Sequence, residues 1–491
     1  MAKKEQMTPE QKKVVQVRGR DLLVAAAAGS GKTWVLVKRI IARMKEERLD
    51  ITAFLLVTFT KAAAAEMRER FTKAIEAEQE ALLLMEHTDE EALAYWNRQE
   101  SLVYQAQICT IDSFCADIVK QYFMHIEVDP NYRIAEEGEL KILRSEVMDA
   151  LLEEEYEKQD EDFLYLVECY APGRNDRKIA ELVLRLTEFQ MSHANPDQWI
   201  LHAKAQIKDI SYYTKELCYH IGQMLAPACL DAKEAGEIAQ LEDGEKVRAL
   251  LQEEYDLLCR MREMAEQSEI EALEARLKQP GFQTLRFPKE YDEESKEQIK
   301  AYREHYKKIV KQLKESFFKV PYETQCSDLL AMAPVVETLL ELSRTFRIRY
   351  QERKRKEAVA DFSDVEHMAL EILTELDEQG IRHPSAIAQK LKEEYAEIMI
   401  DEYQDSNYLQ EAILSSFADH NMFMVGDMKQ SIYRFRMAEP RLFVDKYETF
   451  ATYDEELSDE VQQVKVELDR NFRSSSNVLE SINYLFYRLM H

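Results

Sequence analysis

The stretch Ala26-Ala-Ala-Gly29-Ser30-Gly31-Lys32-Thr33 constrains the fold of this chain more than any other segment. It follows the apolar run Leu22–Ala27 and precedes a segment whose apolar residues recur at helical spacing. Glycines let backbone N–H groups converge on a phosphate chain, and a helix N-terminus adds partial positive charge. The stretch therefore predicts a phosphate-binding loop between a strand and a helix. A glycine turn that caps an ordinary helix is the alternative, since the strict pattern has glycine where Ala26 stands.

Short apolar runs alternate with helical patterns in the first and last parts of the chain. The runs that predict strands are Leu22–Ala27, Ala53–Thr58, Gln107–Ile111, Glu397–Ile400, Met422–Val425 and Val464–Leu468. Each of the first three precedes a polar or glycine-rich turn and then a helix. This alternation predicts an α/β fold with a parallel sheet covered by helices.

The middle of the chain has a different pattern. From about residue 131 to residue 360 apolar residues recur at helical spacing, which predicts nearly continuous helix with loops at prolines such as Pro227. We therefore expect one α/β domain, residues 1–130 and 361–455, interrupted by a large all-helical insertion, residues 131–360. Residues 456–491 would begin a further domain.

A second part of the nucleotide site is predicted far downstream, where the apolar run Ile398–Ile400 ends in Asp401 and Glu402. Lys32 would reach the β- and γ-phosphates of ATP, and Thr33 and Asp401 would hold Mg²⁺. Glu402 would act as general base for the attacking water. The residues whose backbone would surround the phosphates are Ala28, Gly29, Ser30 and Gly31. Taken alone, Asp401-Glu402 is also explained by a strand that meets a solvated turn.

Gln11 has two interpretations. Thr8-Pro9-Glu10-Gln11 has the form of a capping box with proline at the first helical position. A glutamine that reads adenine is the functional alternative, and the local sequence does not separate the two.

Composition limits the class of protein. A formal charge of −28 argues against a simple basic coat around nucleic acid, although it allows a local basic channel. The seven cysteines form no C-x-x-C pair, so a disulfide framework or zinc site is not expected and a reducing cytoplasm fits. The N-terminal segment has no apolar signal region, and no apolar run is long enough for a membrane span.

The order and spacing of several blocks resemble the superfamily 1 DNA helicases of the UvrD/Rep type. These blocks are Thr8–Gln11, Ala28–Thr33, Thr58–Met67, Cys109–Cys115, Asp401–Ser406, Val425–Tyr433 and Leu468–Ser474. Further blocks are similar to the AddA component of AddAB-type helicase–nucleases, namely Val128–Ile134, Asp361–Asp364 and Gly426–Arg436. The resemblance implies a P-loop NTPase (RecA-like) motor domain with a helical insertion and the start of a second motor domain.

The same resemblance implies roles for further residues. Gln430 would sense the γ-phosphate, and Arg473 would act as an arginine finger. Phe59, Tyr433 and Phe435 would contact single-stranded DNA, with the two phenylalanines stacking on bases. Thr58 and Ser113 would touch the DNA backbone. Plain core aromatics are the alternative for Phe59 and Phe435.

The resemblance also implies an ATP-dependent DNA helicase with 3′→5′ polarity, acting with an AddB-like partner in double-strand-break repair and homologous recombination. A stand-alone UvrD-like helicase and an inactive module that binds DNA or a partner are the alternatives. No nuclease cluster is identifiable in the sequence, and the blocks that follow Leu468–Ser474 in such helicases are not found. We therefore expect this segment to bind ATP–Mg²⁺ but to hydrolyse ATP slowly by itself.

Some features predict structure or depart from the family pattern. Ser363–Glu366 reads as a capping box, so no catalytic role is expected there. The cationic stretch Arg344–Lys356 is expected to form a solvated helix face, with contact to DNA as the alternative. Asp112 stands where many relatives have histidine, and Lys61 where they often have a small polar residue; the first change would weaken a phosphate contact.

Overall fold

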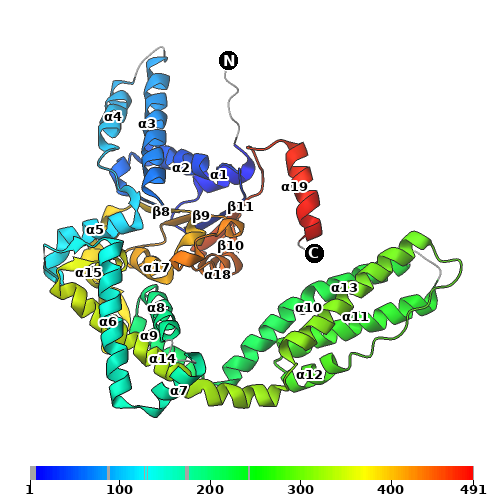
Figure 1. Cartoon of the computed structure of the whole chain (residues 1–491). Helices are drawn as coiled ribbons and strands as arrows, with labels where there is room; N and C mark the ends of the chain where they lie inside the picture. Colours follow the sequence, from blue (N-terminus) through cyan, green and yellow to red (C-terminus); the bar gives the residue numbers. More distant parts are fainter. Residues whose placement is uncertain are drawn as a thin grey trace. The chain divides into compact units, whose positions relative to one another are not determined.

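The computed structural model describes residues 7–85, 89–126, 128–129, 131–171, 176–240 and 244–489. Residues 1–6 of the N-terminal segment and Pro130 of the 128–134 block lie outside the described residues. The chain divides into two compact units (Figure 1). The sheet unit comprises Met1–Leu152, Leu184–Pro196 and Thr345–His491, and the helical unit comprises Glu153–Val183 and Asp197–Arg344.

The sheet unit is built on a 7-stranded sheet with the strand order β10-β11-β1-β9-β8-β2-β3. All neighbouring strands pair in parallel. The strands are β1 (Asp21–Ala26), β2 (Phe54–Thr58), β3 (Ile108–Thr110), β8 (Glu397–Asp401), β9 (Met422–Gly426), β10 (Ala451–Thr452) and β11 (Gln463–Leu468). The central strands are buried along nearly their whole length, as is typical of parallel sheets covered on both faces. The predicted α/β class with a parallel sheet is confirmed.

Helices cover both faces of this sheet. One face packs against α1 (Pro9–Gln16), α2 (Lys32–Glu47), α3 (Lys61–Leu83) and α4 (Glu90–Leu102). The other packs against α5 (Ile111–Tyr122), α15 (Phe362–Leu373), α16 (Ala386–Glu394), α17 (Tyr408–Ser415) and α18 (Arg441–Thr449). Successive residues of β1 alternate between the two cores, because Leu22 and Val24 belong to the first and Leu23 to the second. The sheet unit therefore has two apolar cores that hold the strand ends in place.

β11 is a member of this sheet. It pairs with β1 from Asp21↔Gln463 to Ala26↔Leu468, and its alternate residues Val464, Val466 and Leu468 are buried. The sequence predicts this strand in a further domain, residues 456–491, whereas its pairing with β1 joins it to the first. After it, α19 (Ser476–Leu489) completes the described chain.

The helical unit contains α7 (Glu161–Tyr170), α10 (Ile210–Gln240), α11 (Glu245–Glu266), α12 (Ile270–Lys278) and α13 (Glu293–Phe317). Helices that the two units share are α6 (Glu137–Lys158), α8 (Arg177–Met191) and α14 (Tyr322–Lys356), and α9 (Pro196–Gln206) begins at their boundary. The loop predicted at Pro227 is wrong, since this residue lies inside α10. Proline removes one helical hydrogen bond, but Leu225, Ala228 and Cys229 around it are buried in the core that α10 shares with α11 and α13. None of the described helices is apolar over a length that could cross a bilayer.

The start of α15 corrects two predictions. The capping box is formed by Asp361 and Asp364, two positions earlier than the predicted Ser363–Glu366 box. Lys354 explains the difference, because its ammonium is buried and pairs with both aspartates. The stretch Arg344–Lys356 is therefore not simply a solvated helix face. Two short sheets, β4 (Arg133–Ile134) with β5 (Val359–Ala360) and β6 (Thr374–Leu376) with β7 (Arg382–Pro384), include strands that lie beside this helix in the sequence.

Candidate functional site

The carboxyl ends of the parallel strands lie at one edge of the sheet, where ligands bind in open α/β folds. The loop after β1 joins this strand to α2. Gly29 and Gly31 have φ angles of 73° and 86°, which side-chain-bearing residues rarely adopt. Gly31 is the N-cap of α2 and supplies no capping side chain, so the first N–H groups of this helix remain available to an anion.

Ser30 is an unusual member of this loop. It is buried, and its hydroxyl has no hydrogen-bond partner among the described residues. A buried polar atom without a partner is rare in a folded protein and suits a loop that holds a polar ligand. Gln11 reaches the same loop, since its Nε2 donates to the Ser30 carbonyl oxygen at 3.2 Å. The predicted capping box of Thr8 and Gln11 is confirmed.

The end of β8 meets the loop. Lys32 Nζ donates to Glu402 Oε2 at 2.9 Å, although the two residues are 370 positions apart in the sequence. Glu402 has a left-handed backbone, with φ 56°, which turns the chain sharply after the strand. Burial, together with the charge of Glu402, raises the pKa of the neighbouring Asp401 carboxyl to about 6. A carboxylate that is costly to ionise when unpaired is well suited to a cation ligand. Asp401, with the partly exposed Thr33, fits the Mg²⁺ shell predicted from the sequence.

Gln404 was not singled out from the sequence, yet it lies at the centre of this edge. It follows Glu402 in the 3₁₀ turn η3 (Tyr403–Asp405) and is 1% exposed. Its side chain joins Glu402 to Asp427, the residue after β9. Nothing local marks this glutamine, because its partner beyond β9 is distant in the sequence. Gln430, a predicted phosphate sensor, donates from Nε2 to Asp427 Oδ2 at 2.7 Å.

An aromatic cluster, formed by Phe59, Tyr433 and Phe435, lies after β2 and β9. The rings of Phe59 and Tyr433 have centroids 4.1 Å apart, and those of Tyr433 and Phe435 are 5.7 Å apart. The Arg436 guanidinium lies within 6.0 Å of all three ring centroids. Phe435 is 73% exposed, so the alternative of a plain core aromatic does not hold for it. Phe59 is partly exposed.

The other two predicted DNA contacts are engaged within the protein. Thr58 is buried, and its hydroxyl donates to the Thr60 carbonyl oxygen at 3.1 Å. Ser113 lies in the first turn of α5, where its N–H and hydroxyl bond to the capping hydroxyl of Thr110. Thr58 directly precedes Phe59 of the aromatic cluster, but the structure gives both hydroxyls a local structural role.

The segment after β11 crosses the phosphate loop. Asn471 Nδ2 donates to the Ala28 carbonyl oxygen at 2.7 Å, and Phe472 N–H donates to the Gly29 carbonyl oxygen at 2.8 Å. A Cβ atom on Gly29 would lie 2.8 Å from Asn471 Nδ2 and 2.9 Å from Arg473 Cβ. Arg473 therefore lies against the phosphate loop, and glycine at position 29 is required by space as well as by φ.

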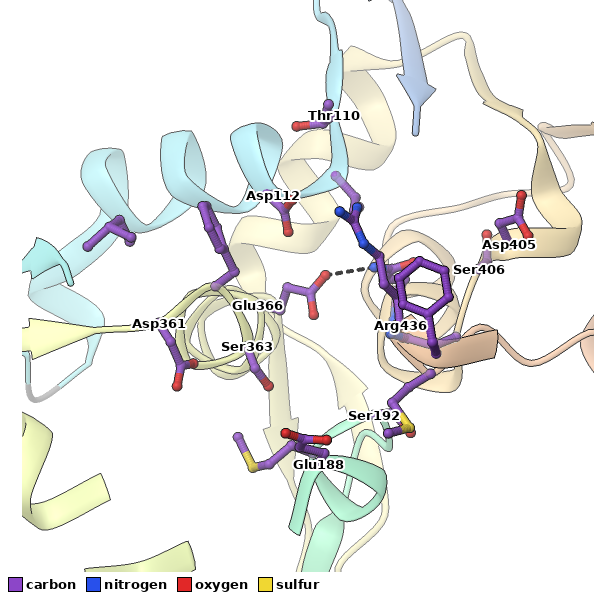
Figure 2. A pocket seen from close by; sticks show the side chains of 18 of the residues that line it. Thr110, Asp112, Glu188, Ser192, Asp361, Ser363, Glu366, Asp405, Ser406 and Arg436 are labelled. Carbon is purple, nitrogen blue, oxygen red and sulfur yellow. Dashed lines mark hydrogen bonds between the residues drawn. The ribbon is translucent and has the colours of Figure 1, made fainter. Parts of the chain in front are cut away.

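A cavity of about 650 Å³ opens between the carboxylates after β8 and the aromatic cluster. Its lining includes Asp112, Ser363, Glu366 and Arg436, whose side chains are labelled in Figure 2. Burial raises the pKa of Glu366 to about 8, and the nearby charge of Asp112 contributes. Glu366 Oε1 accepts from Gln410 Nε2 at 2.8 Å. Glu366 is thus a cavity residue and not part of the capping box predicted for it.

We expect Glu366→Gln to stabilise the protein most at alkaline pH. The ordinary pKa of a glutamate side chain is 4.5, and in the folded protein the pKa of Glu366 is about 8. Folding therefore takes up a proton between these values, so the stability of the unchanged protein falls as pH rises from 4.5 towards 8. Glutamine stays neutral and lacks this contribution, on the order of a few kcal/mol. Urea unfolding at about pH 5, 7 and 9 measures the effect; a stability difference independent of pH would contradict it.

Comparison with known proteins is consistent with this geometry. A family model described as the UvrD/REP helicase N-terminal domain matches residues 7–451. The chain is similar to the ATP-dependent helicase/nuclease AddA protein of Lachnoclostridium phytofermentans, with 41% identity over 503 residues, covering 98% of this chain and 35% of the relative. The proteins of the same description from Geobacillus kaustophilus and Bacillus cereus strain AH187 are 39% and 38% identical, covering 98% and 99% of this chain. The chain spans 39% of each of those two relatives.

Proposed function

The chain belongs to the UvrD/REP helicase family, and on that premise we propose that it is the ATP-driven motor segment of a DNA helicase. The observation that carries the proposal is the contact between Lys32 and Glu402. It brings the phosphate loop together with the acidic end of β8, which is the arrangement that nucleotide hydrolysis by a P-loop enzyme requires.

The nucleotide would occupy the space beside the loop after β1. Backbone N–H groups of residues 28–32 and the Lys32 ammonium would hold its phosphates, and Gln11 would read its adenine. Thr33 and Asp401 would hold Mg²⁺, which when bound neutralises phosphate charge. Glu402 would take the proton of the attacking water. Arg473, beside Gly29, would balance charge on the transferred phosphoryl group, and Gln430 would respond to it.

Single-stranded DNA would bind at the aromatic cluster. Phe59, Tyr433 and Phe435 offer ring faces that accept any base, and Arg436 supplies a cation beside them. Such tolerance of sequence is what a translocating motor needs. Thr58 and Ser113 remain proposed backbone contacts, although their hydroxyls also have partners within the protein.

Truncation of the exposed phenyl ring should weaken DNA binding. We expect Phe435→Ala to cost about 1–3 kcal/mol in affinity for a short oligothymidylate, since one base–aromatic stack is lost. Fluorescence anisotropy with labelled DNA measures this. Tyr104→Ala is a matched control, because Tyr104 is 76% exposed in a different part of the sheet unit. Equal losses in both variants would argue against a stacking role for Phe435.

The names of the relatives support a more specific proposal. We infer that the chain acts within an AddAB-type helicase–nuclease, with an AddB-like partner, in double-strand-break repair and homologous recombination in the cytoplasm. The polarity proposed is 3′→5′. The domains proposed are a first motor domain (1–130 and 361–455), a helical insertion (131–360) and the start of a second motor domain (456–491), whose first strand, β11, extends the sheet of the first.

Two measurements test the function. A fluorescent ATP analogue with Mg²⁺ should bind the chain, and its presence should change the affinity for single-stranded DNA. An idle binding module would show no such nucleotide-dependent change. Unwinding of duplexes with a 3′ or a 5′ tail, by the chain with its partner protein, tests the polarity; preference for the 5′ tail would overturn that part of the proposal.

A further inference from the structure

The side chain of Gln404 uses both ends of its amide between two strand ends. Its Nε2 donates to Glu402 Oε2 at 2.9 Å, and its Oε1 accepts from the Asp427 N–H at 3.0 Å. The same Nε2 lies 3.3 Å from Asp405 Oδ2. A planar amide held at both ends in a buried site has few other positions to adopt, so the Glu402 carboxylate and the Asp427 backbone are kept in register.

Gly426 provides the room for this amide. A Cβ atom on Gly426 would lie 2.3 Å from Gln404 Oε1 and 3.3 Å from the Gln404 nitrogen. The φ of Gly426 is not in the left-handed region, so the glycine is required here by space and not by backbone conformation. Gly426 and Gln404 therefore form one packed unit between β8 and β9.

The segment that begins at Asp427 leads to the aromatic cluster. Asp427 accepts from Gln430 Nε2, and the turns η4 (Met428–Gln430) and η5 (Arg434–Arg436) follow. The Ser431 hydroxyl lies 3.4 Å from Asp405 Oδ1, which ties this segment a second time to the turn that carries Gln404. A shift of Asp427 relative to Glu402 would therefore move Tyr433 and Phe435.

We propose that Gln404 is the positioning residue through which the nucleotide at Lys32 and Glu402 is coupled to DNA at the aromatic cluster. The inference rests on the proposed function. Nucleotide phosphates compete for Lys32 and so change the environment of Glu402 Oε2, the atom to which Gln404 donates. The amide transmits that change to Asp427. Gln404 itself touches neither ligand.

The test measures a coupling factor, defined as the ratio of oligothymidylate dissociation constants without and with adenylyl-imidodiphosphate–Mg²⁺. Couplings between sites typically amount to about 5–150-fold. We expect Gln404→Ala to bring the factor to about 1, with affinity for each ligand alone nearly unchanged. Gly426→Ala should do the same, because its new methyl group displaces the amide.

The double variant Gln404→Ala with Gly426→Ala gives a sharper result. Once the amide is gone, the Gly426 substitution has little left to displace, so the double variant should resemble the single ones and not show a further loss. Gln99→Ala is the matched control. Gln99 is also fully buried and also bonded at both ends, to the Ile51 N–H and to Asp50 Oδ1, but it lies on α4.

The outcomes separate the inference from its premise. A normal coupling factor in Gln404→Ala, with both ligands bound, overturns the positioning role and leaves the proposed function standing. A similar loss of coupling in Gln99→Ala also overturns it, since the effect would then follow from destabilisation. If the unchanged chain binds no nucleotide, the proposed function itself fails.

Discussion

Glu402→Gln is expected to lower the rate of ATP hydrolysis about 10²–10⁴-fold, the usual contribution of a general base. Glutamine keeps the size of the side chain and an oxygen that can accept from Lys32 and Gln404, as Glu402 Oε2 does. It cannot take a proton from water. Nucleotide binding should therefore survive, and only the chemical step should be lost. Single-turnover hydrolysis of labelled ATP and equilibrium binding of a fluorescent analogue measure the two effects separately.

Glu411→Gln is the control for this substitution. Glu411 also accepts from a lysine at 2.9 Å, that of Lys446, and it is also partly buried, but it lies on α17 outside the nucleotide site. Its variant should keep the original rate. Lys32→Ala should lose nucleotide affinity as well as turnover, because the phosphates lose their cation. Unchanged rates in both Lys32→Ala and Glu402→Gln would overturn the assignment of the site.

The strands and the phosphate loop were predictable because their signals are local. An apolar run followed by a glycine turn and a helical pattern describes β1 through α2 within a short segment of the chain, and β8 and β9 are similar buried runs. The pairing of Lys32 with Glu402 was predictable in a different way. It follows from the order of blocks that resemble a family, and no spacing rule connects residues so far apart.

The failures were of two kinds. Capping patterns overlap in the segment from Asp361 to Glu366, and the choice between them depends on Lys354, whose buried ammonium lies on another helix. Gln404 was missed because its role depends on Asp427 and on the space left by Gly426. In both cases a tertiary partner decides between local alternatives, and a partner from another element is not visible in a local window.

Arg39 is a third residue whose importance comes from tertiary structure, and its substitution should have the largest effect on stability. Arg39 is 1% exposed on the buried face of α2, and its guanidinium pairs with the buried Glu397 at the start of β8. Arg39→Met keeps the apolar stem but leaves the Glu397 carboxylate with only Arg43, 3.3 Å from its second oxygen. Breaking a buried pair from one side costs about 3–5 kcal/mol.

Urea unfolding of the Arg39→Met variant measures this cost directly. Lys73→Met is the control, since Lys73 pairs with Glu69 on α3 with both side chains about two-thirds exposed, and such pairs contribute roughly 0.3–0.5 kcal/mol. The double variant Arg39→Met with Glu397→Gln should recover part of the lost stability, because the uncompensated charge is then gone. If the double variant is less stable than Arg39→Met alone, the cost arises from lost packing of α2 on the sheet and not from the stranded carboxylate.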